Sequence, residues 1–122
     1  MPRVIHFEIN ADEPERAAEF YSELFGWRVI KDEAVDYWLL ITGEEGQPGI
    51  DGGIRRRMSP GAATVNSIEV PSVDDFLKKV VAKGGRALTS RMTIPGIGYM
   101  AYCMDTEGNT FGLFQEDKSA VG

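Results

Sequence analysis

The chain repeats one order of predicted elements, strand-helix-strand-strand-strand, and this repetition limits the folds that it can adopt. In each half, alternating polar and apolar residues predict strands, and apolar residues at helical spacing predict a single helix. The predicted elements of the first half are strands at residues 4–9, 27–31, 37–41 and 50–57 and a helix at residues 14–25. Those of the second half are strands at residues 63–70, 86–90, 98–104 and 110–115 and a helix between Ser72 and Gly84.

The ends of the two predicted helices keep nearly the same spacing. Asp12 and Ser72 are the expected N-caps and lie 60 positions apart. Gly26 and Gly84 are the expected helix ends and lie 58 positions apart. This agreement indicates a duplicated unit rather than a chance succession of elements.

The duplication predicts one α+β domain built from two tandem modules. The domain is expected to cover residues 1–122, with module one at about residues 1–58 and module two at about residues 62–116. A length of 122 residues is close to the commonest domain size. The tail from Glu116 to Gly122 is expected to be frayed.

Composition narrows the classes of partner and location. Asp and Glu number 19 against 13 Lys and Arg, and the resulting formal charge of −6 argues against nucleic acid. No long apolar stretch is present, so we expect neither a signal peptide nor a membrane span. The single cysteine, Cys103, lies in an apolar run and is expected to be buried and unreactive. A chain without disulfides fits a cytoplasmic location.

Two modules of this kind are expected to form curved mixed sheets around a cleft. Each helix covers one face of its sheet, so residues on the opposite face of each first strand would line the cleft. These residues are His6 and Glu8 in module one and Ser67 and Glu69 in module two. Because buried polar groups need partners, we interpret the four either as ligand contacts or as groups that bond to neighbouring protein atoms or face water.

Two further segments are candidates for contact with a ligand. Gly52-Gly53 interrupts a predicted strand, which indicates a bulge or the close approach of another group to the backbone. Residues 92–99 are read as a loop, at whose end Tyr99 would place a ring and a hydroxyl near the cleft. The alternative for this loop is a hairpin connection packed by Ile94 and Ile97.

The segments near the two ends of the chain carry a recognisable pattern. It runs through His6-Phe7-Glu8-Ile9, Asp12-Glu13-Pro14-Glu15-Arg16-Ala17, Phe20-Tyr21, Leu24-Phe25-Gly26-Trp27 and Asp105-Thr106-Glu107-Gly108-Asn109-Thr110-Phe111-Gly112-Leu113. This pattern resembles the vicinal oxygen chelate superfamily, which includes glyoxalase I, the bleomycin-resistance proteins and the extradiol dioxygenases. The resemblance implies a glyoxalase-like fold of paired modules and a homodimer. In metal-dependent members it also implies a divalent metal held by His and Glu from the inner strand faces.

Most positions that the resemblance assigns to metal ligands carry other residues here. His6 matches the first position, but its second-half counterpart falls in Val65-Asn66-Ser67, and the closing-strand carboxylate position falls at Gly112. The matching place in the first half falls near Asp51-Gly52-Gly53, and Asp51 could be a ligand only with a register shifted by one or two residues. We therefore expect no catalytic metal, and we expect the two glycines to leave volume in which a ligand can approach the backbone.

The expected function is the binding of a small organic molecule in the cleft without a catalytic metal. If a reaction occurs, His6 or Glu8 is the predicted proton-transfer group. The predicted ligand contacts are Gly53, Ser67, Glu69, Tyr99 and Gly112. The alternatives are a metal-dependent lyase or dioxygenase, including one with an unorthodox site of His6, Glu8 and Glu69, a drug-sequestering protein of the bleomycin-resistance type, and a dimeric interaction module without a ligand.

Overall fold

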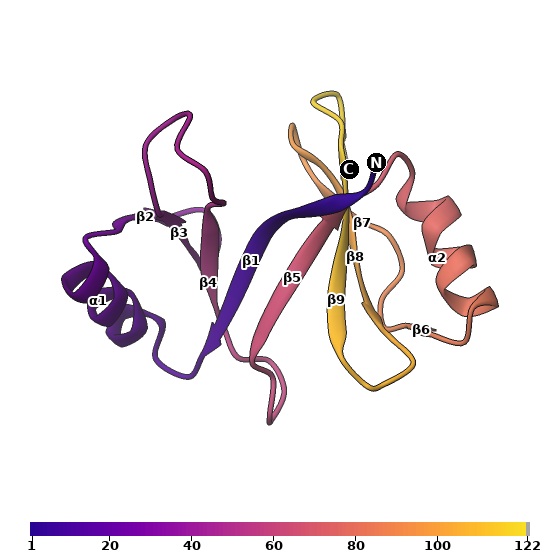
Figure 1. The fold of residues 1–122 in the computed structure, drawn as a ribbon, viewed down its shortest axis with the longest axis horizontal. Coiled ribbons are helices and arrows are strands. Elements are labelled where there is room, and N and C mark those ends of the chain that lie inside the picture. Colours follow the sequence, from indigo (N-terminus) through magenta and orange to yellow (C-terminus); the bar gives the residue numbers. More distant parts are fainter. Residues whose placement is uncertain (122) are drawn as a thin grey trace. The chain divides into compact units, whose positions relative to one another are not determined.

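The computed structural model describes residues 1–121, in which nine strands and two helices are found (Figure 1). The elements are β1 (Arg3–Ala11), α1 (Pro14–Phe25), β2 (Arg28–Asp32), β3 (Tyr37–Ile41), β4 (Gly52–Arg56), β5 (Thr64–Glu69), α2 (Val73–Ala82), β6 (Arg86–Ala87), β7 (Met92–Ile94), β8 (Gly98–Met104) and β9 (Thr110–Glu116). None of the helices in the described residues is long and apolar enough to cross a membrane.

The chain forms two compact units, which are described separately below. The N-terminal unit consists of residues 6–65, and the C-terminal unit consists of residues 66–121 together with residues 1–5. The strands of the N-terminal unit are ordered β2-β3-β4-β1, with β1 parallel to β4 and the other neighbours antiparallel. The main strands of the C-terminal unit are ordered β6-β8-β9-β5, with β5 parallel to β9. The predicted duplication of the α+β fold is therefore confirmed in the topology.

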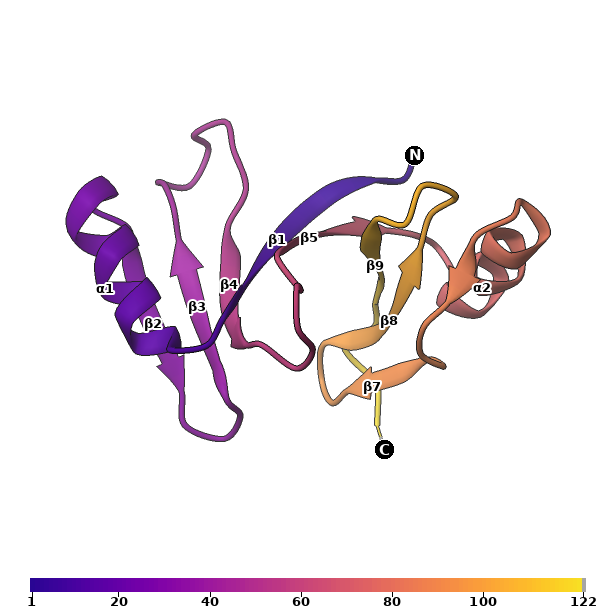
Figure 2. The ribbon, with the colours of Figure 1, turned by 90° about the horizontal axis from the view of Figure 1, so that it is seen from below.

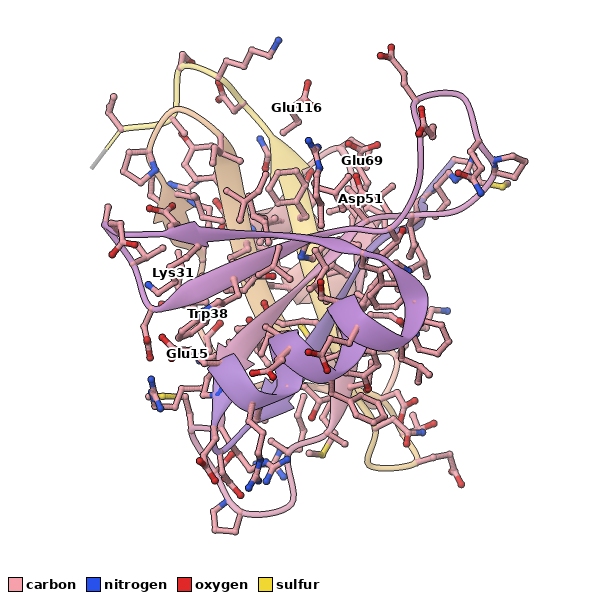
Figure 3. All side chains as sticks on the ribbon, turned by 90° about the vertical axis from the view of Figure 1, so that its left-hand side faces the viewer. Glu15, Lys31, Trp38, Asp51, Glu69 and Glu116 are labelled. Carbon is pink, nitrogen blue, oxygen red and sulfur yellow. The ribbon has the colours of Figure 1, made fainter. Side chains whose placement is uncertain are left out.

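The core of the N-terminal unit lies between α1 and one face of its sheet. Ala18 of α1 packs there with Trp38, Leu40 and Ile54 from the strands. The Nζ atom of Lys31 lies 4.6 Å from the centroid of the Trp38 ring, and Figure 3 shows both side chains beside α1. Trp38 is only 5% exposed and is a core residue.

The core of the C-terminal unit has the same plan. Val73 at the start of α2 packs against Val70, Ala101, Cys103 and Leu113. Cys103 is fully buried and burial raises the pKa of its thiol, so the expectation of a buried small side chain is confirmed.

The two helices begin differently. Ser72 caps α2 as predicted, because its hydroxyl accepts a hydrogen bond from the backbone N–H of Asp75. The predicted cap at Asp12 is wrong: the residue before α1 is Glu13, and its side chain makes no capping hydrogen bond. The Asp12 carboxylate instead pairs with Arg57 at 2.9 Å, a partner 45 positions away that local sequence cannot reveal.

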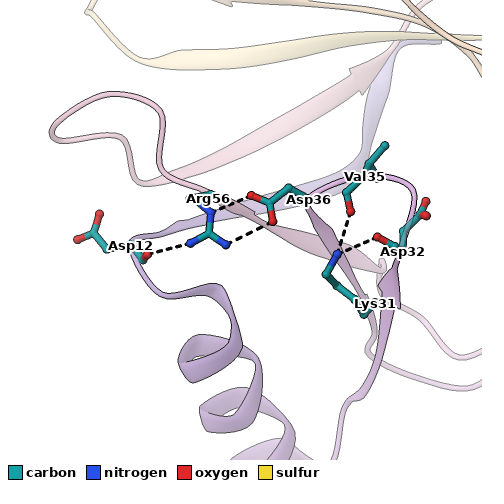
Figure 4. A network of polar contacts seen from close by, with 6 residues as sticks. All are labelled: Asp12, Lys31, Asp32, Val35, Asp36 and Arg56. Atoms are coloured by element: carbon teal, nitrogen blue, oxygen red, sulfur yellow. Dashed lines mark hydrogen bonds and ion pairs between the residues drawn. The ribbon is translucent and has the colours of Figure 1, made fainter.

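A polar network closes the turn between β2 and β3 (Figure 4). The Arg56 guanidinium donates to both carboxylate oxygens of Asp36, at 2.8 and 3.3 Å, and to the Asp12 carbonyl at 3.5 Å. The Lys31 ammonium donates to the carbonyls of Asp32 and Val35, each at 2.9 Å. These contacts lie at the exposed end of the sheet and have a structural role.

Residues 92–98 form a hairpin rather than a site loop. β7 pairs antiparallel with β8 (Figure 2), as in the hairpin raised as the alternative, but Ile97, which was expected to pack it, is 53% exposed. The predicted frayed tail is wrong for the described residues, because Ala120 is only 1% exposed and its carbonyl accepts a hydrogen bond from the N–H of Gly96 at 2.9 Å. The tail is therefore fastened to the hairpin.

Candidate functional site

The face of the N-terminal sheet turned away from α1 carries a row of polar side chains on β1. Phe7 and Ile9 pack into the core, so the alternation of the strand turns His6, Glu8 and Asn10 to the opposite face. Glu8 and Asn10 are buried and His6 is half-buried. The predicted orientation of His6 and Glu8 is therefore confirmed.

The strand register places Glu8 beside a glycine and an apolar patch. Glu8 pairs with Gly53 of β4, Gly53 pairs with Leu39 of β3, and Leu39 pairs with Ile30 of β2. Leu39 and Ile30 are 37% and 45% exposed and form a small apolar patch on this face. A carboxylate and an apolar wall thus share one row across the sheet.

Tyr37 completes the polar group, and the sequence reading did not select it. Its hydroxyl lies 2.7 Å from Nε2 of His6, although the two residues are 31 positions apart. Its ring lies across Gly53, in the space that a side chain on that glycine would fill. The alternation in the sequence indicates that Tyr37 and Leu39 share one face of their strand. The register that brings Tyr37 to His6, however, depends on two other strands, β4 and β1.

The Glu8 carboxylate has a cationic neighbour. The Nη1 atom of Arg55 lies 3.7 Å from Oε1 of Glu8, and the Arg55 side chain is itself mostly buried. Arg55 also pairs across the sheet with Tyr37. We refer to His6, Glu8, Tyr37 and Arg55 together as the His6 cluster.

The local environment holds His6 in its neutral form. Burial lowers the pKa of the imidazole below its usual 6.5, and the negative charges of Glu8 and Asp51 raise it by smaller amounts. A neutral imidazole near pH 7 can accept a proton, and the hydrogen bond to Tyr37 fixes the orientation of the ring.

The side chains present do not supply the set of ligands that a metal-dependent member of the resembled superfamily would need. Within residues 1–121, no group of three or more His, Cys, Asp and Glu side chains is placed to hold a metal ion. Asp51, the candidate that required a shifted register, accepts hydrogen bonds from the backbone N–H and the hydroxyl of Thr42, at 2.9 and 3.3 Å.

The predicted residues of β5 and β9 form a matching row in the C-terminal unit. Ser67 pairs with Gly112, and Gly112 pairs with Tyr102 of β8. Ser67 is buried, and a Cβ atom on Gly112 would lie 2.9 Å from its hydroxyl oxygen. Glu69 is exposed and pairs with Phe114. Each unit thus places a polar residue of its first strand opposite a glycine of its last strand.

Tyr99 lies on the other face of the C-terminal sheet. Its side chain packs against the core beneath α2, and the Arg91 guanidinium lies 4.4 Å from the centroid of its ring. The structure therefore does not bring Tyr99 onto the face that carries Ser67 and Gly112.

Comparison with known proteins bears out the resemblance in the sequence. Residues 3–113 match the model of the Glyoxalase/Bleomycin resistance protein/Dioxygenase superfamily, whereas a search of curated proteins found no match. Methylmalonyl-CoA epimerase from Mycobacterium tuberculosis is similar with a TM-score of 0.69 and 13% identity, over 93% of this chain and 87% of that one. A superfamily member from Vibrio splendidus 12B01 is similar with a TM-score of 0.65 and 14% identity, over 95% of this chain and 100% of that one.

A third similar structure contains a ligand. It is a Streptomyces coelicolor methylmalonyl-CoA epimerase variant in complex with 2-nitronate-propionyl-CoA, with a TM-score of 0.62 and 15% identity over 98% of each chain. At such identities the likeness concerns the fold alone.

Proposed function

The chain belongs to the Glyoxalase/Bleomycin resistance protein/Dioxygenase superfamily, and we propose that it binds a small organic molecule at the His6 cluster without a catalytic metal. The observation that carries this proposal is the hydrogen bond of 2.7 Å between Nε2 of His6 and the Tyr37 hydroxyl. Nε2 of the imidazole is therefore already hydrogen-bonded to a hydroxyl group of the protein.

The surroundings of the cluster favour a ligand with one polar end and an apolar body. The apolar body would lie on Leu39 and Ile30, whose exposed surface a ligand could remove from water at about 25 cal/mol per Å². The polar end would meet Glu8, Tyr37 and Arg55, which offer both hydrogen-bond acceptors and donors. This combination of an apolar wall with a few placed polar groups is typical of small-molecule sites.

For a reaction at this site, His6 and Glu8 are the residues we propose as proton-transfer groups. Burial favours the neutral imidazole, which is able to accept a proton, and the proposal assigns to Tyr37 and Arg55, the neighbours of His6 and Glu8, the role of donors to an oxygen of the ligand. We also propose that Gly53 contributes to ligand binding in the N-terminal unit, and that Ser67, Glu69 and Gly112 contribute to ligand binding in the C-terminal unit. The predicted contact at Tyr99 is not proposed again, because its ring packs beneath α2.

Two measurements on full-length protein purified without a His-tag test the proposal. Metal analysis after incubation with Zn²⁺, Ni²⁺, Mn²⁺ or Fe²⁺ and desalting should find well under one equivalent, and one tightly held equivalent would overturn the metal-free assignment. A thermal-shift screen of metabolites, with an acyl-CoA among them, should find compounds that raise the melting temperature, because a ligand selective for the folded state stabilises it.

The position of any hit is tested with matched variants. Leu39→Ser should weaken binding, whereas Val81→Ser, which changes an exposed apolar residue on α2, should not. Hits that bind both variants as tightly as the original chain would place the ligand elsewhere.

The superfamily resemblance also leads us to propose a homodimer. Light scattering on the full-length protein at several concentrations measures this directly, and a mass near the 13.5 kDa of one chain at all of them would contradict it.

A further inference from the structure

The N-terminal unit contains a cavity of about 800 Å³ that does not coincide with the His6 cluster. Its walls come from two segments, residues 25–28 where α1 leads into β2, and residues 41–51 around the β3–β4 connection. A volume of this size lies within the range of sites for drug-sized ligands. Neither His6, Glu8, Tyr37 nor Arg55 lines it, so the cavity is a candidate for a site of its own.

Internal hydrogen bonds hold the β3–β4 connection in shape. The N–H of Glu44 donates to the Gln47 side-chain oxygen at 2.9 Å, and the N–H of Gln47 donates to the Glu44 carbonyl at 3.0 Å. At the base, the Thr42 hydroxyl donates to the Ile50 carbonyl at 2.6 Å. A wall that is already ordered loses little conformational entropy when a ligand binds.

The charges on the cavity wall favour a cation. Glu44, Glu45 and Asp51 contribute three carboxylates, and Arg28 contributes one guanidinium. Within residues 1–121, both side-chain hydrogen bonds of Asp51 use Oδ1, which leaves Oδ2 for another donor (Asp51 is labelled in Figure 3). The carboxylates of Glu44 and Glu45 accept no hydrogen bond from that same part of the chain.

Aromatic rings give the cavity an apolar side. Phe25 and Trp27 line it, and their ring centroids lie 5.4 Å apart. Aromatic surface next to carboxylates suits an organic ammonium ion, whose body packs against the rings while its charge faces the acidic groups.

We propose that this cavity is a second binding site, which takes a small organic cation with an aromatic or aliphatic body. The proposal rests on the two wall segments and their charges, and it does not depend on ligand binding at the His6 cluster.

The test uses three probes of similar shape and different charge: 2-phenylethylammonium, 2-phenylethanol and 3-phenylpropanoate. Their binding to the full-length ¹⁵N-labelled protein is followed by NMR. The cation should shift the backbone signals of residues 42–51 and the Trp27 indole signal, with an affinity at least about fivefold above that of the anion. Equal affinities for the three probes, or no shifts up to about 10 mM cation, would overturn the proposal.

Variants separate a specific site from general attraction to an acidic protein. Glu44→Gln/Glu45→Gln should weaken binding of the cation by about threefold or more, whereas Glu33→Gln/Glu107→Gln, which removes the same charge from exposed turns, should change it little. Equal weakening in both double variants would contradict the site. Shifts confined to His6, Glu8 and Leu39 would also contradict it and would instead support binding at the His6 cluster.

Discussion

The Tyr37 ring lies across Gly53, and its hydroxyl occupies the space that a side chain on this glycine would fill. Tyr37 pairs directly with Arg55, which lies two residues beyond Gly53 on β4. Its side chain therefore reaches the glycine diagonally across the two strands. This arrangement delivers the hydroxyl to His6. The hydrogen bond between Tyr37 and His6, at the centre of the proposed site, therefore depends on the lack of a side chain at Gly53.

Gly53→Ala should displace Tyr37 and break its bond to His6. The added methyl group would overlap the tyrosine ring, and we expect the free energy of unfolding to fall by about 1–3 kcal/mol. Urea unfolding measures the loss, and the His6 NMR signals report the change at the ring. Gly112→Ala is the matched control, because its methyl group would meet only the small Ser67 hydroxyl, so it should cost less. Equal losses in the two variants would contradict the role given to Tyr37.

His6 should make the protein less stable as the pH falls from about 7 to 5. Burial lowers its pKa in the folded state below the value of 6.5 that it has in the unfolded chain. The folded protein therefore binds fewer protons, so this stability is present above the unfolded pKa and is lost as the pH falls through it. His6 is the single histidine, and His6→Gln should flatten the dependence over this range. An unchanged slope in the variant would show that other groups cause it.

Removing the negative charge of Glu8 should lower the pKa of His6 further. Glu8 opposes the effect of burial by stabilising the imidazolium form. An NMR titration of the His6 ring in Glu8→Gln measures the shift. Glu33→Gln, in the exposed β2–β3 turn, is the control and should leave the titration unchanged.

Cys103 should be unreactive towards thiol reagents until the protein unfolds. Its side chain is fully buried, and burial raises its pKa, so little thiolate is present and none is accessible. Modification by a disulfide reagent, followed in the absence and presence of urea, should track unfolding. Moving the thiol to the surface in Cys103→Ser/Ser59→Cys should give rapid modification of the folded protein. Fast reaction of the original chain would contradict the burial.

Because the C-terminal tail packs against the hairpin, substitutions at two adjacent tail residues should differ in their effect on the free energy of unfolding. Ala120→Glu would bury a charge and should lower the free energy of unfolding by at least about 2 kcal/mol. Val121→Glu changes a side chain that is 80% exposed and should have little effect. Similar stabilities for the two variants, measured by urea unfolding, would mean that the tail is not packed.

Residue alternation was sufficient to predict the two faces of the sheets. It predicted that His6 and Glu8 face away from α1, whereas Phe7 and Ile9 face the helix. The structure agrees. Alternation is a local property with a period of two, so it can be read without knowing the partner strand.

Features that depend on distant partners were not predicted. The contact of Tyr37 with His6 needs the register of β3, β4 and β1 together, and the ion pair of Asp12 joins residues 45 positions apart. The predicted strand at residues 86–90 ends at Ala87, because the next two N–H groups both donate to the Tyr102 carbonyl. Such choices among competing hydrogen bonds are decided by the tertiary structure.

The parallel pairing of the first and last strands in each unit also bears on synthesis of the chain. β1 finds its partner only when β4 has been made, and β5 must wait for β9, while the elements between them can form earlier from local contacts. During translation, the edge of β1 that pairs with β4 and the edge of β5 that pairs with β9 therefore emerge before the strands that will cover them. We expect these two segments to be where a nascent chain is most exposed to aggregation or to a chaperone.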